Sequence, residues 1–176
     1  MNITWRNIDT SGRRYNIEAS NLVVGELTLF GPFLSNAHYY TSQGGIRFNK
    51  NGNTWQTRME LEKNGETVGA LVFRIYKSPS LALKNGKHYT LESNLFGRNL
   101  RWVNADGNPV VSYTDPTMQS MGRGSISISD SLSREEADVL VSTGIVTRNY
   151  FTHKLAITAF FVGFALLGAS KLVSLV

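Results

Sequence analysis

Residues 57–72 read TRMELEKNGETVGALV, and the pattern in this stretch decides the fold. Apolar and charged side chains alternate up to Asn64-Gly65, and apolar residues return at every second position from Val68. Alternation with a period of two is typical of a strand with one buried face. Asn-Gly supplies the positive φ angles that a two-residue hairpin turn needs. The stretch therefore predicts a β-hairpin.

Turns of the same kind recur on both sides of this hairpin. They separate stretches rich in β-branched and aromatic residues, and residues 125–129 (SISIS) alternate strictly. Many antiparallel strands joined by tight turns ordinarily curl into a barrel or a sandwich, which removes exposed edges. We therefore predict a mainly β domain, an antiparallel meander that closes into a barrel of about ten to twelve strands. The other turn pairs are Asn51-Gly52, Asn85-Gly86 and Asp106-Gly107.

Length and composition limit the class of protein. A chain of 176 residues is long enough for one domain with a substantial core and a short tail. With 18 Lys and Arg against 13 Asp and Glu, the net charge of +5 is compatible with an anionic partner but does not require one. Because the chain has no cysteine, disulfides and thiolate chemistry are excluded. The first residues lack the basic and apolar regions of a cleavable signal peptide.

The pattern changes after residue 130, where a helix over 134–150 is predicted. Ser133 with Glu136 three residues later fits a capping box, and acidic residues fill the first turn. The following residues are apolar on most sides up to Val146, with Gly144 as a weak point. Such a helix suits the interior of a barrel, and an amphipathic helix on the outside of the sheet is the alternative.

The acidic start Glu135-Glu136 and the aliphatic continuation to Gly144-Ile145-Val146, directly after the strand GSISIS, resemble the tubby-like superfamily. This superfamily includes tubby C-terminal domains, LURP-one-related proteins and phospholipid scramblases. The resemblance covers most of residues 1–150 and implies a closed antiparallel barrel with a hydrophobic helix through its middle. The chain has no scramblase-like cysteine run, proline-rich arm or calcium site. We expect residues 1–152 to form this domain and 153–176 to form a separate hydrophobic tail.

Residues 155–170 read LAITAFFVGFALLGAS, an uncharged run of a length close to that of a bilayer. As a helix the run would span about 24 Å, and with the residues up to Val176 about 33 Å, while a bilayer core is about 30 Å thick. The tail is therefore either a membrane anchor or a helix packed inside the barrel, and the separate helix at 134–150 favours the anchor. The expected anchor side chains are Leu155, Phe160, Phe161, Phe164 and Leu167.

The flanks of the tail predict its orientation. Arg148, His153 and Lys154 precede the run and Lys171 follows it, so the denser positive flank would keep the barrel in the cytoplasm. Ala159 and Gly163 have the spacing that lets membrane helices approach closely, which makes a homo-oligomer through the tail a further expectation. A cytoplasmic, soluble protein is the alternative localisation.

One stretch of the predicted sheet is rich in basic residues and has Glu92 as its one acidic residue. If these residues share a face, they predict a surface for anionic phospholipid, where each Lys or Arg contributes about 1 kcal/mol. The alternative is that these basic residues lie on the solvent-exposed face of the strands only because they keep the protein soluble. Nucleic acid is disfavoured, because the aromatic residues recur at strand spacing and are expected in the core. The basic residues are Arg74, Lys77, Lys84, Lys87, Arg98 and Arg101.

Catalytic chemistry has little support in the sequence. His38, His88 and His153 have no second ligand type at metal spacing, and no nucleophile or phosphate-loop motif is present. We predict no catalytic residue, metal or cofactor. The sequence favours a non-catalytic, membrane-associated β-barrel that binds anionic phospholipid. The alternative is a soluble barrel whose C-terminal helix fills its own core and which acts as a protein-interaction module.

Overall fold

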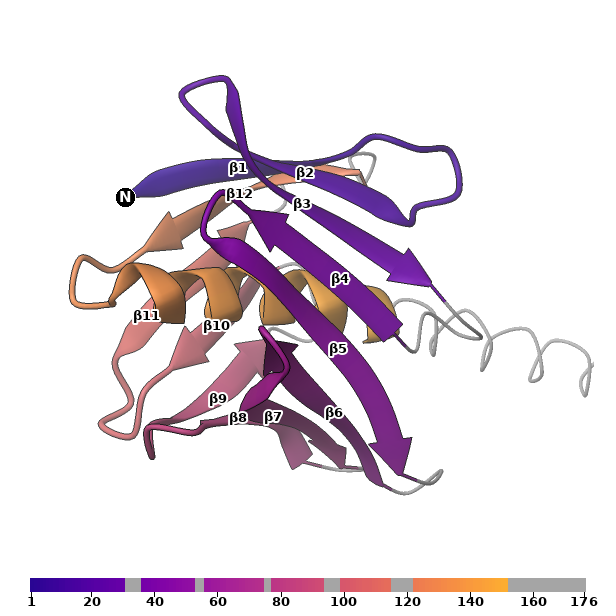
Figure 1. Ribbon diagram of the computed structural model, residues 1–176. Helices are drawn as coiled ribbons and strands as arrows, with labels where there is room; N and C mark the ends of the chain where they lie inside the picture. The colour runs from indigo at the N-terminus through magenta and orange to yellow at the C-terminus, as the bar shows by residue number, and fades with distance from the viewer. Residues whose placement is uncertain (31–35, 53–55, 75–76, 94–98, 115–121, 152–176) are drawn as a thin grey trace, which may run out of the picture.

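The computed structural model describes residues 1–30, 36–52, 56–74, 77–93, 99–114 and 122–151. Within them, twelve antiparallel strands form one closed barrel, which confirms the predicted mainly β meander (Figure 1). The strands are β1 (Asn2–Asn7), β2 (Arg14–Ala19), β3 (Leu22–Phe30), β4 (Asn36–Thr41), β5 (Gly44–Gly52), β6 (Gln56–Lys63), β7 (Glu66–Arg74), β8 (Lys77–Leu83), β9 (His88–Ser93), β10 (Asn99–Val103), β11 (Pro109–Thr114) and β12 (Arg123–Ile128).

Each strand pairs with the next along the chain, and β1 closes the barrel by pairing with both β2 and β12. Trp5 marks the closure, because it lies opposite Ile17 on one side and Gly124 on the other. Gly124 is required there: a β-carbon at this position would be 2.6 Å from Trp5 Nε1. A meander of this kind places every second connection at the same end of the barrel.

The predicted hairpin at Asn64-Gly65 is confirmed, and both residues have positive φ angles, 55° and 81°. The turn predicted at Asn51-Gly52 is wrong. Both residues belong to β5 and continue its ladder with β6, where Gly52 lies opposite Thr57. Buried apolar residues further along β5 and β6 fix the register of these two strands. In that register the ladder continues through Asn51 and Gly52, so no turn forms there.

The C-terminal helix spans residues 134–151 and lies inside the barrel (Figure 1), and we call it the interior helix. Every residue from 139 to 147 is buried, so no face of the helix is left to solvent. Its polar contacts reach strands on different sides of the barrel. They are Tyr15 Oη to Asn149 Oδ1 at 2.7 Å, Trp102 Nε1 to the Leu140 carbonyl at 3.1 Å, and Thr57 Oγ1 to Tyr150 Oη at 3.1 Å.

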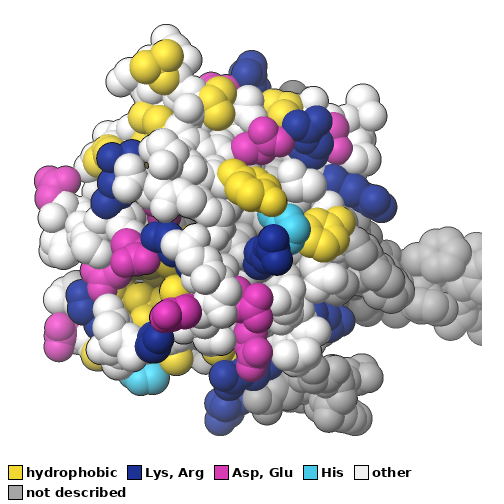
Figure 2. Space-filling view, in the orientation of Figure 1, with side chains coloured by type: hydrophobic (Ala, Val, Ile, Leu, Met, Phe, Trp, Pro, Cys, Tyr) yellow, Lys and Arg dark blue, Asp and Glu magenta, His cyan; other side chains and the backbone are white. Residues whose placement is uncertain are grey.

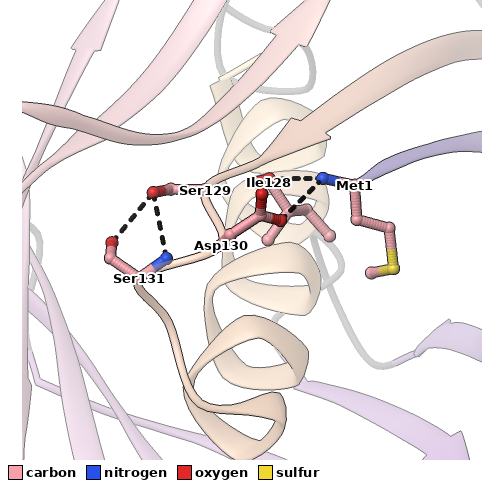
Figure 3. A network of polar contacts seen from close by, with 5 residues as sticks. All are labelled: Met1, Ile128, Ser129, Asp130 and Ser131. Atoms are coloured by element: carbon pink, nitrogen blue, oxygen red, sulfur yellow. Dashed lines mark hydrogen bonds and ion pairs between the residues drawn. The ribbon is translucent and has the colours of Figure 1, made fainter.

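The predicted helix at 134–150 and its capping box are confirmed. The Glu136 N–H donates to Ser133 Oγ at 3.3 Å, and the Ser133 N–H donates to Glu136 Oε2 at 3.2 Å. The turn that leads into the helix is held to the first strand (Figure 3). There the Met1 ammonium donates to the Ile128 carbonyl at 2.8 Å and to Asp130 Oδ1 at 3.3 Å.

The interior helix gives the barrel two different ends. We call the end where the helix begins the cap end, which contains the turns 64–65, 84–87 and 104–108. The other end, where the described part of the helix reaches Phe151, is the exit end. Its described connection is the loop 8–13, which is tied to the end of the helix because Tyr15 Oη donates to both the Gly12 carbonyl and Asn149.

Within residues 1–151, apart from the gaps given above, no helix combines the length and the hydrophobicity needed to cross a bilayer. The predicted tail at 153–176, with its five expected anchor side chains, lies outside the described residues.

Candidate functional site

The structure does not bring the predicted basic residues to one surface. Arg74 and Lys77 are cross-strand partners at the exit end. Lys84 and Lys87 lie in the turn between β8 and β9 at the cap end. The seven residues of β8 separate these pairs by roughly 20 Å. Arg98 lies outside the described residues.

Three of the six predicted residues are already ion-paired. The distances are 3.0 Å between Lys84 Nζ and Glu66 Oε2, 2.6 Å between Lys87 Nζ and Glu136 Oε1, and 2.7 Å between Arg101 Nε and Glu92 Oε2. A carboxylate in contact lowers the attraction of a cation for a second anion. These three residues are therefore poorer candidates for lipid headgroups than Arg74 and Lys77. The role of all six in lipid binding stays a prediction.

The exit end has a group of exposed basic residues without ion pairs. Within the described chain, no carboxylate lies within 4.0 Å of Arg13, Arg74, Lys77 or Arg123. All four are exposed. We define the exit rim as these four residues together with two partly exposed apolar side chains of the same end, Ile8 and Phe151, which are 41% and 37% exposed.

Asp9, the carboxylate of the 8–13 loop at this end, makes its hydrogen bonds within that loop. Its Oδ1 accepts hydrogen bonds from the N–H groups of Arg13 at 2.8 Å and Arg14 at 3.0 Å, and the Ser11 hydroxyl donates to its Oδ2. Burial raises the pKa of Asp9, but these donors outweigh that effect and lower it below its ordinary value of 3.8. Asp9 therefore stabilises the 8–13 loop and leaves the side chain of Arg13 unpaired.

Aromatic contacts connect the rim to the end of the interior helix. The Tyr150 ring stacks on Phe73 with centroids 4.4 Å apart, and Phe151 meets Phe73 edge-on at 6.1 Å. Phe73 precedes Arg74 in β7, so Arg74 extends from a strand fixed against the helix end. In the interior helix, about one turn before Phe151, the Arg148 guanidinium lies 4.6 Å from the centroid of the Trp5 ring. Phe73 thus connects two rim residues, Arg74 and Phe151, to the same part of the barrel wall.

The cap end has the opposite character. Its polar contacts are ion pairs, such as Lys63 with Glu135 at 2.8 Å, and acidic residues surround the start of the interior helix. Half-buried Asp138 follows them, and burial raises its pKa above the ordinary 3.8 although Arg134 and Lys63 act in the other direction. The described carboxylates at or near this end are Glu18, Glu62, Glu66, Asp106, Asp130, Glu135, Glu136 and Asp138.

The histidines form no catalytic or metal site in the described structure. His38 lies on the outer face of β4 between Phe30 and Tyr40, with ring centroids 4.7 and 5.8 Å away, and Figure 2 shows a histidine between two hydrophobic side chains. Burial and the charge of Arg47 lower the pKa of His38. His88 is exposed at the start of β9, and His153 lies outside the described residues. Among the described residues, no three His, Cys, Asp or Glu side chains form a group that would hold a metal.

Neither protein-family models, nor curated proteins, nor solved structures match this chain. The resemblance to the tubby-like superfamily therefore stays a prediction, although the barrel and its interior helix have the arrangement that the resemblance implies.

Arg13, Arg123, Ile8 and Phe151 are rim residues that the sequence reasoning missed. It grouped basic residues by their closeness along the chain. In a meander, the first, third and fifth connections between strands lie at one end of the barrel, and the second, fourth and sixth lie at the other. The number of a connection along the chain therefore predicts at which end its residues lie. Sorting the residues next to strand ends by whether this number is odd or even would have placed Arg13 and Arg123 with Arg74 and Lys77.

Proposed function

We propose that this chain is a non-catalytic β-barrel held at a membrane by residues 153–176, with the barrel domain 1–152 in the cytoplasm. The observation that carries the proposal is the occupancy of the barrel interior. The interior helix is buried on all sides from residue 139 to 147, so it fills the space that the second apolar segment would need. A bilayer is the apolar environment that matches the length of the tail.

Charge supports this arrangement. In the sequence, Lys154 stands directly before the uncharged run, and the exit end of the barrel carries four basic residues that have no ion pair within the described chain. Positive charge next to a spanning helix favours the cytoplasmic side. The distal Lys171 can extend its ammonium to the far interface.

A protein-interaction module is the second candidate, and one observation favours it. The hairpin of β2 and β3 exposes three consecutive aliphatic side chains, Leu22, Val23 and Val24, at 70%, 57% and 37%. Contiguous apolar surface of this kind is typical of contacts with another protein. In this case residues 155–170 would cover protein surface rather than enter lipid.

Extraction of membranes with alkaline carbonate tests the proposal. The full-length chain is expected in the carbonate-resistant pellet, and a chain ending at Thr152 in the soluble fraction. A full-length variant with Phe160→Asp and Phe164→Asp is the matched control, because each charge at mid-bilayer costs about 3 kcal/mol without changing the length. It is expected to be released by carbonate. A full-length chain that stays soluble, while the chain ending at Thr152 is insoluble, would show that the tail belongs to the protein core.

A further inference from the structure

We propose that the exit rim is seated on the anionic headgroups of the same bilayer, so that the barrel stands on the membrane with its cap end pointing away. The proposal rests on the proposed function, because it needs the tail in the membrane. It adds the lipid class that the barrel contacts, the residues that make the contact and the orientation of the domain.

The first argument is the length of the tether. The described part of the interior helix reaches Phe151, and the uncharged run begins at Leu155, four residues later. Four residues reach at most about 14 Å when fully extended. The headgroup region adds roughly 6 Å to each side of the hydrocarbon core, and charges act over about 8 Å at physiological salt. With the tail in the bilayer, the exit rim is therefore held where headgroup charges reach it.

The second argument is charge complementarity. Arg13, Arg74, Lys77 and Arg123 are exposed and free of carboxylate partners in the described chain, and Figure 2 shows Lys and Arg side chains at this edge of the barrel. They attract anionic lipids at close range. Around the start of the interior helix, Lys63, Lys84 and Lys87 are instead ion-paired to Glu135, Glu66 and Glu136, which lowers their attraction to the same surface. The charge distribution of the barrel thus favours one orientation.

The third argument is the apolar content of the same end. Ile8 and Phe151 remain partly exposed beside the basic residues, a combination typical of surfaces that rest at a lipid interface. The cap end also exposes apolar side chains, Leu22 and Val23 of the β2–β3 hairpin, so charge rather than apolar surface distinguishes the two ends.

The absence of cysteine makes orientation directly measurable. We would introduce single cysteines into the full-length chain at Thr10, in the exit loop, or at Ser42, in the cap-end turn between β4 and β5. Each is labelled with a fluorophore, and quenching by headgroup-labelled lipid is recorded in phosphatidylcholine vesicles with and without phosphatidylserine. Strong quenching is expected at Thr10 and weak quenching at Ser42, with a further rise at Thr10 when phosphatidylserine is present.

Charge variants connect this signal to the rim. Each removed positive charge weakens attraction to an anionic surface about fivefold, so Arg74→Gln, Lys77→Gln and Arg123→Gln together reduce it roughly a hundredfold. The phosphatidylserine-dependent rise at Thr10 is then expected to vanish. The matched control is Arg47→Gln, Lys84→Gln and Arg134→Gln, which removes the same charge from exposed positions away from the rim. This control variant is expected to keep the rise in quenching at Thr10 when phosphatidylserine is present.

The outcomes separate this proposal from the proposed function. If the full-length chain does not float with either kind of vesicle, the membrane function fails. If the chain floats with both, but Thr10 and Ser42 are quenched equally, or both triple variants behave alike, the membrane function stands and the rim proposal is overturned. Unfolding temperatures of the two triple variants establish that both are folded, which is expected because all six side chains are exposed.

Discussion

Gly144 of the interior helix lies directly against the ring of Tyr113, where a β-carbon would come within 2.1 Å of the Tyr113 Cζ atom. The Tyr113 hydroxyl donates to the Leu140 carbonyl at 2.5 Å, one turn earlier. The absence of a side chain at Gly144 thus lets the ring rest on the helix backbone. Glycine costs a helix about 1 kcal/mol relative to alanine, and here the close approach of β11 offsets that cost.

Gly144→Ala is therefore expected to destabilise the protein although alanine is the better helix former. Overpacking of a filled core costs about 1–3 kcal/mol, and the urea midpoint measures the change. Combining Gly144→Ala with Tyr113→Leu should cost less than the two single changes added together, because the smaller side chain removes the clash. Strict additivity would show that the contact does not determine the choice of glycine.

Glu136→Gln is expected to lower the free energy of unfolding by about 1 kcal/mol at neutral pH, because it removes the negative charge that pairs with Lys87 and stabilises the N-terminus of the helix, although glutamine can still form the capping box. Burial raises the pKa of Glu136, but Lys87, Ser133 and Asn85 outweigh that effect and lower it below the ordinary 4.5. The stabilisation is therefore present above that value and is lost as the pH falls through the folded-state pKa.

Urea unfolding of both proteins at neutral and acidic pH checks this prediction. The difference between wild type and variant should disappear at acidic pH. Glu66→Gln is the control, since Glu66 makes a comparable ion pair with Lys84 in full solvent and should have no measurable effect. A pH-independent difference would argue against the contribution of the Glu136 charge.

Asp138→Asn is expected to stabilise the protein at neutral pH. The folded-state pKa of Asp138 is raised above its ordinary 3.8, chiefly by burial. The folded protein therefore binds this proton more tightly than the unfolded chain, and stability falls as the pH rises from 3.8 through the folded-state pKa. Asparagine does not ionise, so thermal unfolding should show the gain growing over that window and then levelling off. A gain that does not vary with pH would contradict the role of burial.

The buried pair of Thr57 and Tyr150 allows a double-mutant test of how the end of the helix is held. Their hydroxyls are 3.1 Å apart, so removing either leaves the other without this partner at a cost of about 1–3 kcal/mol. Thr57→Val and Tyr150→Phe together should cost less than the sum of the two single changes. Urea unfolding of the four proteins gives the coupling energy. A coupling energy of zero would mean that the contact between the two hydroxyls does not help to hold this end of the helix.

Local sequence signals predicted the features that depend on neighbouring residues. The Asn64-Gly65 turn and the Ser133–Glu136 capping box both form as expected, because each is built from backbone angles and contacts within four residues. The turn expected at Asn51-Gly52 is wrong for the converse reason. There the ladder between β5 and β6 overrides a local preference of the same kind.

The amino-acid sequence by itself determined the alternation of the strands, three of the four predicted Asn-Gly and Asp-Gly turns and the start of the helix after Ser133, because these follow from side chains close together in the chain. Only the tertiary structure decided that the helix lies inside the barrel, and that Lys84 and Lys87 are at the opposite end from Arg74 and Lys77. Those outcomes depend on how twelve strands pair in a closed barrel and on which end of the barrel each connection reaches. Closure couples residues more than a hundred positions apart, as the pairing of β1 with β12 does, and no local pattern contains that information.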